Sequence, residues 1–147
     1  MYIEKLIKIV KDRVDNYPFF DVMVRELAQE KDSGTQRDVN SFIKSKNTIS
    51  KIVEIMAVKN IMVDEKIYII EKWRTIIEET LNKFKKVDKF KGSIIEYKIA
   101  THKSNKEIGE LKNLGENCVR LYIRDFYIEL GIGAILKKMI DIQMLNR

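Results

Sequence analysis

The amino-acid sequence predicts an all-α protein with an Ile-rich helical N-terminal region. Along nearly the whole chain of 147 residues, apolar residues recur at intervals of three and four, as on one face of a helix. No stretch sustains the alternation of two that marks a strand. Helix breakers are scarce, since the chain holds one Pro and six Gly. About eight helices are therefore expected.

Four of these helices are expected before residue 87, at residues 2–14, 21–30, 36–59 and 64–85. Pro18 ends the first, because proline disfavours helix at the residue before it. Residues 31–34 (Lys-Asp-Ser-Gly) predict a loop, and Asp64 predicts a new N-cap. The inward residues are expected to be Ile3, Leu6, Ile7 and Val10; Val24 and Leu27; Val39, Phe42, Ile43, Ile49, Ile52, Val53 and Met56; and Ile67, Ile70, Trp73, Ile77, Leu81 and Phe84.

The charged junction 83–91 leads into a helix through Ile94, Ile95 and Ile99. Two short helices are then expected around a turn at residues 113–115 (Asn-Leu-Gly), whose Asn and Gly tolerate left-handed backbone. Ser104 is a plausible N-cap, and Glu107 completes a capping box.

The residues expected to face inward in these two helices are Ile108 and Leu111, then Val119, Tyr122, Ile123 and Phe126. Glycines at 131 and 133 are expected to end the second helix, before a last one at 134–145 with Leu136, Met139, Ile140 and Met144 on one side.

This segment has the pattern of a helix-turn-helix. Residues 105–132 resemble the DNA-binding helices of LuxR-type response regulators and region 4 of bacterial sigma factors, through "NKEIG", "ENCVRLYIR" and "YIELGI". Gly109 stands where those families usually carry Ala, and Lys112 where an apolar residue is common. The layout, a long helix and "KKVDKFKGSIIEYK" before the motif, resembles phage late-transcription regulators of the ArpU and RinA kind.

The resemblance implies a sequence-specific transcription regulator that binds double-stranded DNA. Asn117, Arg120 and Arg124 can reach base edges or phosphates, and Lys103, Lys106 and Lys112 the backbone. The alternatives are a pairing of Arg120 with Glu116 within the helix, and lysines that are merely solvated. The full set expected at the DNA is Lys103, Asn105, Lys106, Lys112, Glu116, Asn117, Arg120, Leu121 and Arg124.

Composition bounds the remaining function classes. The net charge of +6 favours a polyanionic partner, but residues 1–86 and 87–147 carry +3 each, so charge alone does not locate the site. One Cys and one His, Cys118 and His102, exclude the usual zinc sets, so no metal or cofactor is expected. No nucleophile has a base beside it, and no enzyme activity is expected. No apolar run is long enough for a membrane span, and a cytoplasmic location is expected.

We expect two functional regions, 1–86 and 87–147, the second being the DNA-binding domain. The first region is either a dimerisation domain, which favours a homodimer, or a surface that binds RNA polymerase, as in sigma-like phage activators. A third alternative is a helical protein-interaction module, such as an anti-sigma factor or small-terminase-like oligomer, without sequence-specific DNA readout.

Overall fold

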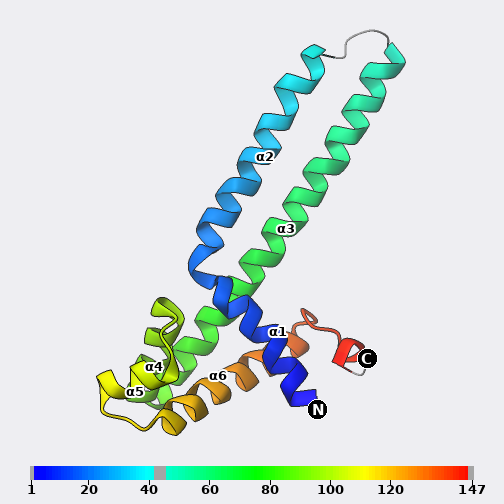
Figure 1. Ribbon diagram of the computed structural model, residues 1–147. Coiled ribbons are helices and arrows are strands. Elements are labelled where there is room, and N and C mark those ends of the chain that lie inside the picture. The colour runs from blue at the N-terminus through cyan, green and yellow to red at the C-terminus, as the bar shows by residue number, and fades with distance from the viewer. Residues whose placement is uncertain (1, 42–45, 146–147) are drawn as a thin grey trace. The chain divides into compact units, whose positions relative to one another are not determined.

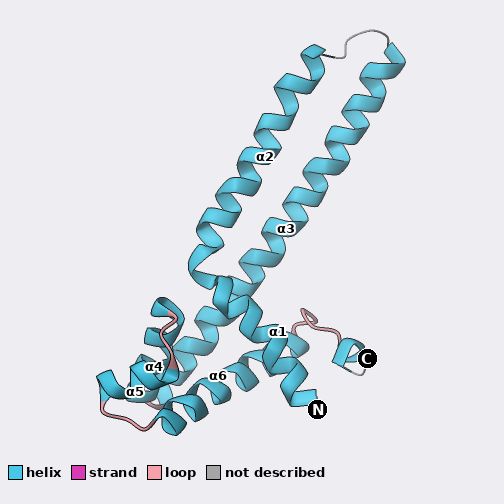
Figure 2. Ribbon diagram, viewed as in Figure 1, coloured by secondary structure: helices cyan, strands magenta, loops and turns pink. Residues whose placement is uncertain are grey.

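All the regular structure in the described part of the chain is helical, which confirms the all-α prediction (Figure 2). The computed structural model describes residues 2–41 and 46–145, and side chains at 2–31, 51–143 and 145. The elements are α1 (Tyr2–Asn16), a 3-10 helix (Tyr17–Phe19), α2 (Phe20–Ser41), α3 (Lys46–Val87), α4 (Lys89–Thr101), α5 (Asn105–Lys112), α6 (Glu116–Leu136) and α7 (Ile142–Leu145).

The chain forms two compact units. The first unit comprises Met1–Pro18 and Trp73–Arg147, and the second comprises Phe19–Lys72. The long helix α3 belongs to both. The expected division at residue 87 is a division of function and stays a prediction. The compact units have other boundaries, because α1 packs on α6 and so belongs with the C-terminal helices.

The core of the first unit is built from α1, the end of α3, and α4, α5 and α6. Trp73 is buried, as expected, and the Arg13 guanidinium of α1 lies 5.4 Å from its ring centroid. The Phe84 and Phe126 rings meet edge to face at 5.8 Å. The largest fully buried side chains of this unit are Val10, Ile77, Ile94, Ile95, Ile108, Val119, Phe126 and Leu130.

The second unit is a pair of helices, α2 and the first part of α3, which run side by side in opposite directions (Figure 1). An ion pair joins them, with the Lys31 ammonium 3.1 Å from the Asp64 carboxylate. The predicted loop at residues 31–34 is wrong, because α2 continues through it; one glycine costs a helix only about 1 kcal/mol. The predicted N-cap at Asp64 is also wrong, since α3 is unbroken there.

Pro18 ends α1 as predicted, because a 3-10 turn follows Asn16. Ile3 and Val53, both expected inward, are exposed. Ile3 lies in the first turn of α1, and Val53 lies at one edge of its apolar stripe. The predicted positions Val39, Phe42, Ile43, Ile49 and Met144 lie outside the described side chains.

The predicted end of α6 at the glycines is wrong, because the helix continues to Leu136. A Cβ built on Gly131 would meet Leu6 Cγ at 2.6 Å, so this glycine lets α1 pack closely rather than ending the helix. Leu136, expected inward on a separate helix, is exposed at the end of α6, while Ile140 is buried as predicted. Beyond a turn, the last helix is the short α7.

Candidate nucleic-acid interface

Two helices meet around a three-residue turn where the sequence predicts them. The Ser104 hydroxyl caps α5 by accepting a hydrogen bond from the Glu107 backbone N–H at 3.2 Å. Asn113 ends α5 in the left-handed conformation, with φ 59° and ψ 42°. Gly115 is extended rather than left-handed and serves as the N-cap of α6, without a side-chain bond. The caps therefore define both ends of the turn.

Gly109 makes this turn possible. The Leu114 N–H donates to the Gly109 carbonyl at 2.8 Å, and a Cβ on Gly109 would lie 2.6 Å from the Leu114 carbonyl oxygen. A backbone oxygen cannot move away as the end of a flexible side chain can. The turn is thus too tight for alanine at position 109 unless the backbone shifts.

The interior of the two-helix unit largely follows the prediction. Val119, Ile123 and Phe126 are buried, and Tyr122 is half-buried. Leu111, however, is 58% exposed, contrary to expectation. At 100° per residue, the buried pair Ile108 and Gly109 sets the inward direction of α5, and Leu111 lies more than a quarter turn from it.

One face of α6 presents polar side chains to solvent. Asn117, Arg120, Leu121 and Arg124 are all exposed, and their spacing of three and four places them together on the first half of the helix. We call these four residues the α6 face. Within the described residues, no ion pair joins Arg120 or Arg124 to a carboxylate, so the alternative pairing of Arg120 with Glu116 is not formed. Glu116 itself is exposed in the first turn.

Two of the three acidic residues of α6, Asp125 and Glu129, are paired with lysines of other helices. The Lys91 ammonium contacts the Asp125 carboxylate at 2.8 Å, and Lys83 contacts Glu129 at 3.1 Å. Lys91 also lies over the Phe84 and Tyr122 rings, 5.4 and 5.2 Å from their centroids. These contacts hold two negative charges away from the arginines, so the α6 face is basic.

A second basic group surrounds Tyr97 on α4, and no pattern in the sequence predicts it. The ammonium groups of Lys103 and Lys112 lie 5.7 and 5.1 Å from the ring centroid. The Lys98 ammonium donates to the Lys103 carbonyl at 2.6 Å. Burial, together with the nearby charge of Lys11, lowers the pKa of Lys98. We call Tyr97, Lys103 and Lys112 the Tyr97 cluster. Its residues come from α4, from the loop before α5 and from the end of α5, so the periodicity of a single helix does not predict it.

Lys106 and Asn105, the other two residues of α5 expected at the DNA, differ in exposure. Lys106 is exposed. Asn105 is half-buried, and its side-chain oxygen is enclosed without a hydrogen-bond partner. Asn105 therefore faces the protein more than the solvent.

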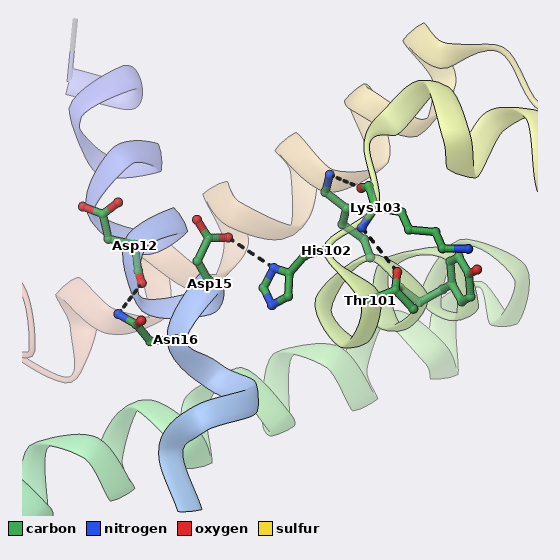
Figure 3. A network of polar contacts seen from close by, with 8 residues as sticks. Asp12, Asp15, Asn16, Thr101, His102 and Lys103 are labelled. Atoms are coloured by element: carbon green, nitrogen blue, oxygen red, sulfur yellow. Dashed lines mark hydrogen bonds and ion pairs between the residues drawn. The ribbon is translucent and has the colours of Figure 1, made fainter. Parts of the chain in front are cut away.

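His102 lies at the end of α4, opposite the end of α1 (Figure 3). Its Nδ1 is 3.8 Å from an Asp15 carboxylate oxygen, and its backbone is left-handed with φ 56°. His102 is thus an exposed loop residue whose side chain faces α1. In the last turn of α4, the Thr101 hydroxyl donates a hydrogen bond to the Tyr97 carbonyl at 2.7 Å.

Cys118 is half-buried near the start of α6. A hydrogen bond between its side chain and the Tyr122 hydroxyl raises the pKa of the phenol. Among the described residues, no group of three or more His, Cys, Asp or Glu side chains could hold a metal ion. In the same part of the chain, none of the helices has both the length and the apolar character of a membrane span.

Comparison of the chain with protein-family models, curated proteins and solved structures gives no match.

Proposed function

We propose that this protein is a sequence-specific DNA-binding transcription regulator that places the first half of α6, within residues 116–130, in the major groove. The main support is the α6 face: two arginines and an asparagine stand exposed on one helix and are free of the described carboxylates. Arg pairs well with guanine and Asn with adenine in the major groove, and Leu121 can contact a thymine methyl.

The lysines supply contacts that position the protein without reading sequence. Lys106 and the Tyr97 cluster lie on α4, on α5 and in the loop between them, and Lys112 is next to the turn that leads into α6. Two ammonium groups held over one ring lose less freedom when they bind a phosphate than two free lysines do. A homodimer would place two α6 faces on half-sites about one helical turn apart.

The test begins by selecting bound sequences from a random duplex pool with the full chain. Fluorescence anisotropy then compares the preferred duplex with a shuffled duplex of the same composition. Arg120→Ala should lose roughly 1–3 kcal/mol of binding free energy on the preferred duplex, because a bidentate contact to a base is lost. The sequence preference should relax at one base position. Arg124→Ala is measured in parallel.

Two controls separate base readout from general charge. Lys106→Ala should weaken binding to both duplexes equally, because it removes one phosphate contact. The slope of log binding constant against log salt concentration should fall by about one. Lys8→Ala removes the same charge from the exposed side of α1 and should leave both affinities unchanged. If Arg120→Ala and Arg124→Ala are folded and bind as the wild type does, the groove assignment is wrong. The helical interaction module then replaces it.

A further inference from the structure

A stripe of apolar side chains runs along α3 within the second unit. Ile55, Val58, Met62 and Ile69 follow one another at intervals of three, four and seven, the spacing of a coiled-coil seam. Ile61 and Tyr68 border them. All six are between 45% and 67% exposed. We call these six residues the α3 stripe.

The stripe is separate from the buried side of the same helix. Val63 and Ile70 are buried, and Ile52, Met56 and Ile67 are half-buried. At 100° per residue, the direction of Val63 and Ile70 lies more than a quarter of a turn from that of Met62 and Ile69. This helix therefore carries two apolar seams, of which one is covered within the second unit and the other is open.

The open seam is large for a monomer. A large aliphatic side chain that is half to two-thirds exposed leaves about 100 Å² of surface accessible, so the α3 stripe amounts to roughly 600 Å². Monomeric proteins rarely leave more than a few hundred Å² of apolar surface in one patch. Two such stripes facing each other would remove at most about 1,200 Å² from water, which reaches the lower limit for a specific interface.

We propose that the α3 stripe is the surface through which two copies of this chain associate, with the two α3 helices parallel. The edges of the stripe favour a second copy. Glu54 borders one edge and Lys59, five positions later, borders the other. Parallel pairing places Glu54 against Lys59 of the second copy, whereas antiparallel pairing places Lys59 near Lys66 of the second copy.

Glu65 limits the strength of this association. It occupies a seam position between Met62 and Ile69 and, in a parallel pair, faces Glu65 of the second copy. A polar residue in a seam fixes the register of the pair and lowers its stability. Glu65→Leu should therefore tighten association by at least tenfold.

The experiment measures the mass of the full chain without DNA, by sedimentation equilibrium over a range of micromolar concentrations. We expect a dimer for the wild type and at least tenfold weaker association for Met62→Lys. Val53→Lys is the matched control: Val53 is 55% exposed on the same helix but lies half a turn from Met62, and its variant should remain dimeric. Circular dichroism checks that all variants keep their helix content.

Oxidative cross-linking supplies a second test that introduces no charge. In a Cys118→Ser background, Ile55→Cys should form a disulfide-linked dimer, because parallel pairing places residue 55 against its counterpart, and Val53→Cys should not. A monomeric wild type overturns the proposal and leaves the stripe to a different protein. A dimer that Met62→Lys leaves intact, or that Val53→Cys cross-links as readily as Ile55→Cys, overturns it as well. DNA is absent throughout, so failure here does not bear on DNA binding.

Discussion

At the scale of single residues, burial controls the chemistry of Tyr127 on α6. Its phenol is buried in the first unit, which, with the nearby Asp15 carboxylate, raises the pKa of Tyr127 to about 12 from 10.0. The folded state thus holds this proton more tightly than the unfolded state does. The resulting stabilisation is fully present below pH 10 and is lost as the pH rises toward 12.

The prediction is an alkaline loss of stability that depends on this phenol. Two pKa units correspond to at most roughly 2–3 kcal/mol of the free energy of unfolding. Urea unfolding at pH 8 and pH 11 should show a smaller decrease for Tyr127→Phe than for the wild type. Tyr2→Phe, at an exposed tyrosine of α1, should follow the wild type. Equal decreases for wild type and Tyr127→Phe would contradict the assignment.

Residue patterns account for much of the candidate interface, but not all of it. The exposed positions of Asn117, Arg120 and Arg124 follow from the period of one helix, and the sequence predicts them. The Tyr97 cluster and the ion pair between Lys91 and Asp125 join separate elements. No spacing rule connects residues that meet only after the chain folds, so these contacts were missed.

At the scale of elements, the glycines of α6 determine how closely other helices approach it. A Cβ on Gly131 would contact three Leu6 side-chain carbons at 2.6–2.9 Å, and Leu6 is itself buried. A Cβ on Gly133 would meet the Ile76 side chain, 3.1 Å from its terminal methyl and 3.7 Å from Cγ1. A Cβ on Gly131 would overlap the branch point of the Leu6 side chain, which cannot move without shifting the whole side chain. A Cβ on Gly133 would touch the end of the Ile76 side chain, which can adjust.

The two alanine substitutions should therefore have opposite effects on the free energy of unfolding. Gly131→Ala should destabilise by about 1–2 kcal/mol, because overpacking against Leu6 exceeds the gain in helix propensity. Gly133→Ala should stabilise by about 0.5–1 kcal/mol through that propensity. Urea titration of both variants decides the matter. A stabilising Gly131→Ala would show that α1 does not pack closely on α6.

At the scale of the whole molecule, the two proposals together make a joint prediction. If each copy contributes one α6 face, a duplex with two half-sites is bound by a dimer and a duplex with one half-site by a single chain. Met62→Lys should then weaken binding to the two-site duplex at least tenfold while leaving the one-site affinity unchanged, because linkage between the copies is lost.

Anisotropy titrations with the two duplexes at equal salt measure this difference, and Val53→Lys is again the control. If Met62→Lys and the wild type bind the two-site duplex equally, association through the α3 stripe does not contribute to DNA binding.

The sequence by itself determined the all-α class, the ends of α5, the turn at residues 113–115 and the start of α6. These features are local: a helix period, a capping hydroxyl at Ser104 and a left-handed Asn113 act within a few residues. Only the tertiary structure decided that α2 continues through Gly34, that α3 passes Asp64 and that α6 passes two glycines. Each of these breakers costs a helix at most about 1 kcal/mol, and contacts with a distant element can exceed that cost: Asp64 pairs with Lys31 of α2, and Gly131 admits Leu6 of α1.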